Sequence, residues 1–277
     1  MTSRHAEPRE IPSASVLPEL GEIIRVTLRV GTLLARSGAA AFRVREAMQR
    51  TAAALGVQRS EFVVAVDSIS ASVFDAGEFR TQVVRLPPLG VDMNLLSRTE
   101  LLTRALGSEA DTLSSAELQH RLDALEAGAS VYPRWLSVPS LGVACAAFCA
   151  AGHGSALQIA AAFVGAAAGH ALRLELLRRR LPLVSIVVVC AFVSCFMAKL
   201  TLLPAGWLAS DTPPSGVETL ASVLYLIPGV PLVTSLIDLL QLDISCGLSR
   251  AGYAVVILGG IASGVFGFFA IAGALPW

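Results

Sequence analysis

The stretch LYLIPGVPLVTSLIDLL, residues 224–240, is apolar enough to cross a membrane, yet two prolines and a glycine lie near its middle. Pro228 and Pro231 each remove a backbone N–H donor, and each proline ring clashes with a carbonyl of the preceding turn. In lipid a freed backbone group is costly unless protein or a water-filled cavity satisfies it. We therefore predict a broken transmembrane helix whose interruption faces protein or a polar chamber.

The residues around this break predict a binding site. Broken helices of secondary transporters direct a half-helix N-terminus, which carries partial positive charge, at an anionic substrate group. Three polar side chains follow the break at helical spacing. The substrate-binding candidates are Pro228, Gly229, Pro231, Thr234, Ser235 and Asp238. The alternative is a plain proline kink, with Asp238 as a solvated residue at the helix end.

Three ionisable residues of the apolar half are candidates for ion coupling: Asp238, Lys199 and His170. Lys199 is the only lysine of the chain and lies near the end of an apolar stretch. Snorkelling of its ammonium group to the lipid headgroups is the alternative explanation. For His170 the alternative is an interfacial histidine without a transport role.

The composition places the chain among membrane proteins. It has 277 residues, a mean hydropathy of +0.67 and only 15% charged residues, against about a quarter in soluble domains. A net charge of zero argues against a nucleic-acid partner. Most charges precede Arg134, so we expect a soluble part followed by a membrane part. The first residues contain no apolar signal region, and the soluble part is expected in the cytoplasm.

The soluble part is predicted to be a small α+β domain over residues 17–131, after a flexible N-terminus, residues 1–16. Residues 20–55 show helical periodicity, with Gly31 and Gly38 as a break or a close packing point. Strands rich in β-branched residues are predicted at 62–66, 69–74 and 79–84, the last two forming a hairpin. Helices follow at 93–106 and 115–127, the second with Ser114 and Glu117 as a capping box.

Residues 132–277 are predicted to form five transmembrane helices, so the fold class is an α-helical membrane protein preceded by a cytoplasmic α+β domain. The apolar spans are residues 136–151, 156–172, 183–203, 217–240 and 248–275. Between the second and third spans lie Arg173, Arg178, Arg179 and Arg180, which predicts a cytoplasmic loop. The N-terminus is then inside and Trp277 outside.

Small residues on two spans predict close helix packing. In the second span these are Gly165 and Gly169; in the fifth they are Gly259, Gly260, Ser263, Gly264 and Gly267. The face of the fifth span either packs within the bundle or docks a second membrane subunit. The five cysteines are dispersed among apolar residues without clustered histidines or carboxylates, so we expect neither a metal nor a cofactor.

The segments ASVL (221–224), IPGVPL (227–232), Asp238 and GLSR (247–250) resemble the threonine/serine exporter family, as does GTLL (31–34) in the soluble part. YPRW (132–135) and CAAFC (145–149) are most similar to the larger subunit of its split branch, which exports succinate. The resemblance implies export of a succinate-like dicarboxylate or of threonine and serine across the cytoplasmic membrane, driven by protons. It also implies a small all-membrane partner subunit.

One departure concerns the turn HGSALQ (153–158), which lacks the carboxylate often found there in this family. Two other function classes stay open. The soluble domain is either the catalyst of a membrane-anchored enzyme or a sensory or scaffolding module. Against an enzyme, the sequence contains no Gly-x-Ser-x-Gly elbow, no His-Glu-x-x-His and no phosphate-binding loop.

Overall fold

The computed structural model describes residues 16–57, 59–75, 78–87, 90–106, 114–128, 134–206 and 216–272. The expectations for a flexible N-terminus before residue 16, the hairpin turn at 76–77, the loop after residue 206 and Trp277 lie outside these ranges. The chain divides into two compact units, which we describe separately. Unit 1 is Met1–Ala129 with Val233–Arg250, and unit 2 is Ser130–Leu232 with Ala251–Trp277.

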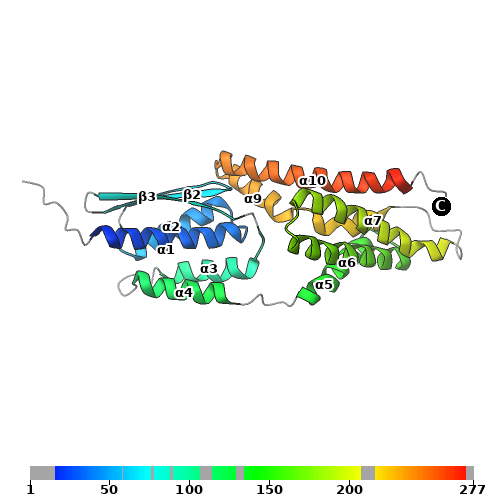
Figure 1. Ribbon diagram of the computed structural model, residues 1–277, viewed down its shortest axis with the longest axis horizontal. Helices are drawn as coiled ribbons and strands as arrows, with labels where there is room; N and C mark the ends of the chain where they lie inside the picture. The colour runs from blue at the N-terminus through cyan, green and yellow to red at the C-terminus, as the bar shows by residue number, and fades with distance from the viewer. Residues whose placement is uncertain are drawn as a thin grey trace, which may run out of the picture. The chain divides into compact units, whose positions relative to one another are not determined.

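Unit 1 contains the predicted α+β fold. Its elements are α1 (Val16–Arg36), α2 (Ala41–Ala54), β1 (Arg59–Val64), β2 (Ser68–Asp75), β3 (Glu78–Arg85), α3 (Met93–Ala105) and α4 (Ser115–Ala127). Helix α1 contacts the sheet as well as α2, α3 and α4, so it runs through the middle of the unit (Figure 1). Its central position explains why α1 is buried on nearly every side.

The sheet is antiparallel with β2 at its centre. On β2 the buried side chains alternate with serines: Ile69, Ala71 and Val73 are fully buried and face the core. The predicted hairpin of the second and third strands is confirmed. Strand β1 begins at Arg59, three residues earlier than expected, because it continues pairing with the far end of β2.

The two glycines of the first helical stretch have different roles. Gly38 ends α1 with a positive φ of 96°, which a glycine adopts without strain, and the chain then turns into α2. Gly31 lies inside α1, where an added Cβ would be 2.5 Å from the sulfur of Met48. Gly38 is therefore the break, and Gly31 is the close packing point.

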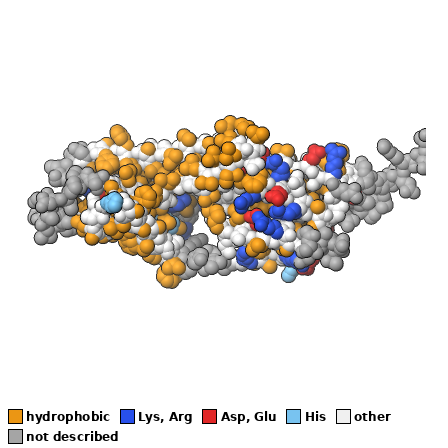
Figure 2. Space-filling view, turned by 180° about the vertical axis from the view of Figure 1, so that it is seen from behind, with side chains coloured by type: hydrophobic (Ala, Val, Ile, Leu, Met, Phe, Trp, Pro, Cys, Tyr) orange, Lys and Arg blue, Asp and Glu red, His pale blue; other side chains and the backbone are white. Residues whose placement is uncertain are grey.

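Unit 2 is a helical bundle. The helices in this half of the chain are α5 (Arg134–Ala151), α6 (Ala156–Arg178), α7 (Leu183–Gly206), α8 (Val217–Val223), the 3₁₀ helix Leu224–Leu226, α9 (Gly229–Leu240) and α10 (Ile244–Ala272). The unit boundaries fall inside α9 and α10, so both helices also contribute to unit 1. Figure 2 shows hydrophobic side chains covering much of the bundle surface, whereas charged side chains gather on unit 1.

Three described helices are long and apolar enough to span a membrane: Ala156–Arg178, Leu183–Leu203 and Ile244–Ala272. A fourth span results if α8 and α9, with the 3₁₀ helix between them, are counted as one bent helix. The apolar part of α5, Trp135–Ala151, is shorter than these. The chain is thus a mostly helical, multi-pass membrane protein with a small sheet near its N-terminus.

Glycines of the bundle pack against neighbouring helices. A Cβ at Gly165 would be 2.6 Å from the carbonyl oxygen of Ser194 in α7 and 2.9 Å from Cβ of Ser222 in α8. Gly260 and Gly264 of α10 face α7 in the same way, with Val187 and Ala191 as neighbours. These small residues therefore serve close packing inside unit 2.

Candidate functional site

The predicted interruption of the helix over residues 217–240 is confirmed. Residues 217–226 and α9 meet at an angle of 65°. A 3₁₀ helix ends at Leu226, Ile227 is extended, and α9 begins at Gly229. Pro231 is the third residue of α9 and therefore lies in its first turn, where a missing N–H donor costs little.

The backbone donors at the break are largely used within the chain. The N–H of Gly229 donates to the carbonyl of Ile227 at 2.8 Å, and that of Leu232 donates to Pro228 at 3.0 Å. Pro231 has no N–H to offer. Gly229 itself borders open space, because an added Cβ would meet nothing within 4 Å. The N-terminus of α9 thus offers few free donors to a substrate anion.

Helix α9 buries its polar residues and exposes its apolar ones. Ser235 and Asp238 are 4% and 0% exposed, whereas Val233, Leu236 and Leu240 are at least 59% exposed. The Ser235 hydroxyl donates to the carbonyl of Gly247 at the start of α10, at 2.9 Å. This inverted pattern is expected where lipid or an apolar partner covers the outer face of a helix.

Asp238 caps a helix that is distant in the sequence. Helix α2 begins after Ala40, whose methyl side chain cannot accept a capping hydrogen bond, and the first turn of α2 contains no acidic residue. The Asp238 carboxylate accepts the N–H of Ala41 at 2.8 Å and thus brings a negative charge to the positive end of α2. Because Asp238 is fully buried, the alternative of a solvated helix-end residue is wrong.

Arg250 completes this arrangement. Its guanidinium is 2% exposed, its Nε lies 3.4 Å from Oδ2 of Asp238, and Nη2 donates to the carbonyl of Ala39 at 2.8 Å. Nearby, Arg45 pairs with Asp243 between α9 and α10. The ends of the two membrane helices are therefore bound to the α1–α2 corner of unit 1. Any change in the charge of Asp238 would leave Arg250 buried without a counter-charge.

His170 lies in a polar contact of unit 2. Its Nε2 is 3.4 Å from the Ser137 hydroxyl of α5, and its ring meets the edge of Tyr225 at 5.7 Å between centroids. Arg173, one turn later, was expected in a loop. The structure places it inside α6, which continues to Arg178 because the sequence ALRLELLR consists of good helix formers. Sequence analysis missed Arg173 as a site candidate.

The other candidates lie apart from these contacts. Lys199 is half-buried near the end of α7. In α10, Gly260 and Gly264 are covered by α7, and a Cβ at Gly267 would be 4.0 Å from Phe192. Gly259 and Ser263 are exposed. The fifth-span glycines are thus divided between a face that packs on α7 and an open face.

A pocket of about 530 Å³ lies elsewhere, between α5 and α6, and no residue of the break lines it. Its walls are Trp135, Val138, Ala171, Leu174, Glu175, Leu177 and Arg178. Within the described ranges no three histidine, cysteine or acidic side chains come together as a metal site. The described cysteines are buried free thiols.

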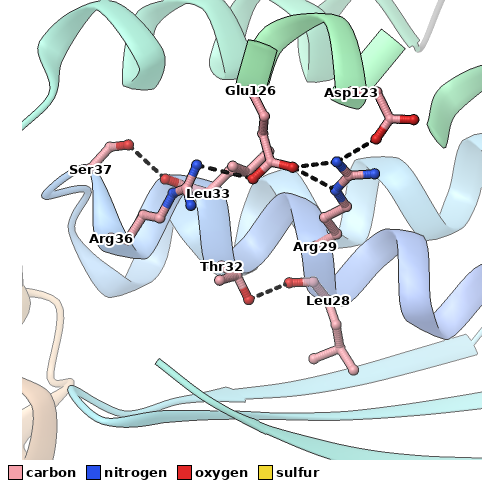
Figure 3. Close-up of polar contacts among 8 residues, drawn as sticks. All are labelled: Leu28, Arg29, Thr32, Leu33, Arg36, Ser37, Asp123 and Glu126. Atoms are coloured by element: carbon pink, nitrogen blue, oxygen red, sulfur yellow. Dashed lines mark hydrogen bonds and ion pairs between the residues drawn. The ribbon is translucent and has the colours of Figure 1, made fainter. Parts of the chain in front are cut away.

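Unit 1 also carries an ion-pair network on its surface (Figure 3). Arg29 and Arg36 of α1 both pair with Glu126 of α4, and Arg29 also binds Asp123 at 2.6 Å. Burial alone would lower the pKa of Arg29, but hydrogen bonds and the charges of Glu126 and Asp123 outweigh it and raise the pKa. This network fastens α4 to the central helix.

Known proteins with similar sequences include proteins named as transporter subunits. Residues 25–272 match the family described as "Putative threonine/serine exporter". A protein of Klebsiella aerogenes named "Probable succinate transporter subunit YjjP" is 27% identical over 236 residues, which are 85% of this chain and 88% of that protein. The protein of the same name from Escherichia coli is 25% identical over 256 residues, 92% and 96% of the two chains. No solved structure matches the chain.

The family match covers both the α+β part and the broken span, and these relatives are named as transporter subunits rather than enzymes. A multi-pass membrane chain with an interrupted helix is an architecture of transport proteins. The chain therefore belongs to the threonine/serine exporter family.

Proposed function

We propose that this chain is the larger subunit of a secondary exporter that moves small organic acids, either a succinate-like dicarboxylate or threonine and serine, out across the cytoplasmic membrane. The observation that carries the proposal is the 65° break between residues 217–226 and α9. Within a span, such a break is tolerated where it is buried in protein or borders a polar cavity, as at transporter binding sites. The names of the relatives support the substrate class.

The proposed topology has five crossings. Helix α5 is the first crossing, a short one whose exposed Trp135 suits the headgroup level. Arg178 and Arg179 then mark the cytoplasmic end of α6, and unit 1 lies in the cytoplasm. In this arrangement the N-terminus is inside and Trp277 is outside.

The substrate site lies at the break, with Pro228, Gly229 and Pro231 at its rim and Thr234, Ser235 and Asp238 along α9. Ser235 and Asp238 are held by Gly247 and by Arg250 with Ala41. Ser235 and Asp238 become available to the substrate when these hydrogen bonds and the ion pair break. Substrate binding is thereby coupled to unit 1. Transport is coupled to protons, and the proton carriers are Asp238, His170 or Lys199.

A small all-membrane partner subunit covers the surfaces that this chain leaves open. These are the apolar face of α9 next to Gly229 and the exposed face of α10 with Gly259 and Ser263. Small residues permit close approach of a second helix on α10. On the opposite face of α10, Gly260, Gly264 and Gly267 lie next to α7.

Gly229→Leu tests the proposal. An added Cβ at Gly229 meets nothing within 4 Å, so membrane insertion should be unchanged, while the larger side chain occupies the space at the break that the substrate or the partner would use. We expect efflux of succinate, threonine or serine from cells to fall about tenfold or more. Pro228→Leu, which favours a continuous helix, should act in the same direction.

Gly252→Leu is the matched control, because Gly252 also borders open space but lies in α10, away from the break. Deleting the chain together with its partner should raise intracellular substrate. Unchanged efflux of all three acids on deletion would contradict the proposed function.

A further inference from the structure

Arg173 forms no ion pair with any acidic side chain among the residues that the structure describes. Within the described part of the chain beyond residue 134, each acidic side chain has a polar partner: Glu175 with Arg178 and Arg179, Glu218 with Gln158, Asp238 with Arg250, and Asp243 with Arg45. The Nε of Arg173 is buried and has no hydrogen-bond partner. An intramembrane arginine in this state calls for a functional explanation.

A second unpaired nitrogen lies one turn away. His170 and Arg173 are three residues apart on α6 and so share a face of the helix. The Nδ1 of His170 is buried and lacks a partner, while its Nε2 faces Ser137 at 3.4 Å. Two nitrogens of neighbouring basic side chains are therefore buried without an acceptor.

Two hydroxyl groups stand beside these nitrogens. The Tyr225 hydroxyl is 3.2 Å from that of Ser194 in α7, and the Tyr225 ring contacts His170. Two hydroxyls that share one hydrogen bond keep one hydrogen to donate elsewhere. Tyr225 belongs to the 3₁₀ helix that ends directly before the break. We call His170, Arg173, Ser194 and Tyr225 the donor cluster.

The backbone of α6 makes room for this cluster. A Cβ at Gly169 would collide with the hydroxyl oxygens of both Ser194 and Tyr225. Glycine at this position lets both hydroxyls approach α6 next to His170.

Snorkelling does not account for Arg173. Arg178 and Arg179, at the end of the same helix, have side chains about 70% exposed and pair with Glu175, as headgroup-level arginines do. Arg173 lies five residues before Arg178, about 8 Å deeper at 1.5 Å per residue. Its buried Nε points to a role inside the bundle.

We propose that the donor cluster binds a carboxylate group of the exported acid, next to the broken helix. A guanidinium, a protonated imidazole nitrogen and a hydroxyl hydrogen can all donate to the two acceptor oxygens of a carboxylate. The break's own N–H groups are largely bonded, so the anion binds to side chains and the break positions Tyr225. This inference rests on the proposed export function.

Succinate binding to the purified full-length chain, together with its partner, in lipid nanodiscs tests the proposal. Arg173→Gln should weaken the Kd for succinate about tenfold or more, since a charge-assisted hydrogen bond is lost. Arg178→Gln, on the same helix, is the matched control and should change the Kd less than about twofold. The neutral diamide of succinate should bind neither protein.

A second, more conservative variant tests the donor cluster in case Arg173→Gln prevents folding. Tyr225→Phe keeps the ring on His170 and removes one hydroxyl, and it should weaken succinate binding several-fold. If Arg173→Gln and Tyr225→Phe both bind and export succinate like the unmodified chain, the donor-cluster proposal is wrong while the export function stands. If the unmodified chain neither binds nor exports succinate, threonine or serine, both proposals are wrong.

Discussion

Arg250 and Arg173 are two inward-facing arginines that differ in how they are satisfied. Arg250 meets Asp238 and a backbone carbonyl in unit 1, so its charge is compensated within the chain. The buried Nε atoms of both arginines lack a hydrogen bond, but that of Arg250 faces Asp238 at 3.4 Å, whereas Arg173 in unit 2 has no ion pair with any acidic side chain that the structure describes. Desolvation of a charge is costly in both places. The difference separates an arginine that is paired and holds two segments together from one that, in our proposal, receives an anion from outside.

The largest expected effect comes from breaking the paired site. Asp238→Ala leaves Arg250 buried without a counter-charge and removes the cap of α2. We expect a loss of about 3–5 kcal/mol in the free energy of unfolding, seen as a strongly lowered Tm of the purified protein. Asp243→Asn, in the partly exposed pair with Arg45, should cost about 1 kcal/mol or less.

The double variant Asp238→Ala with Arg250→Ala sharpens this prediction. Each single variant leaves one buried charge without its partner, whereas the double variant leaves none. The double variant should therefore lose less stability than the two single variants added together. A strictly additive result would mean that the two charges do not interact, and the pair would then not be the anchor described here.

An intermediate effect is expected at the donor cluster. Gly169→Ala pushes the hydroxyls of Ser194 and Tyr225 away from α6 and should cost about 1–3 kcal/mol through overpacking. Succinate export should fall by more than this stability loss explains, because the donors move. Gly252→Ala, with open space around it, serves as the comparison. Equal export by the two alanine variants, measured per inserted protein, would contradict a role for the cluster.

The smallest effect is expected where arginine is solvent-exposed. Arg29→Ala breaks pairs with Glu126 and Asp123 that are 30% exposed or more, so the cost should be about 1 kcal/mol or less and shrink with added salt. Because the pKa of Arg29 is raised, its contribution persists below the usual arginine pKa and is lost only as pH rises through the raised value. Melting curves at low and high salt measure this, and a loss as large as that of Asp238→Ala would contradict our ranking by burial.

Local signals in the sequence predicted much of the fold. Alternation in SISASVF placed β2, and Ser114 accepts the N–H of Glu117 as a cap, although the reciprocal half of the predicted box is not among the described contacts. The two prolines placed the break within a residue or two. Periodicity, capping and proline chemistry act over a few residues, which is why they can be read from one sequence.

Long-range contacts were not predicted. No residue near Ala41 in the sequence indicates that Asp238 caps α2. Helical periodicity also did not predict that α6 would extend past Arg173. One signal was present but not used: Asp238 and Arg250 are opposite charges twelve residues apart in an apolar region, where such groups usually pair. The open face of α10 was predicted only as one of two interpretations, because spacing alone does not say which neighbour a glycine meets.

The remote cap has a consequence for biogenesis. Ala41 and Asp238 are 197 residues apart, so the start of α2 is synthesised long before its partner. At about 5–20 residues per second, the ribosome needs about 10–40 s to cover that distance. During this interval the nascent part of unit 1 lacks its later segment, Val233–Arg250. We expect it to mature only after the fourth span has entered the bilayer, so that membrane insertion acts as a checkpoint for the domain translated first.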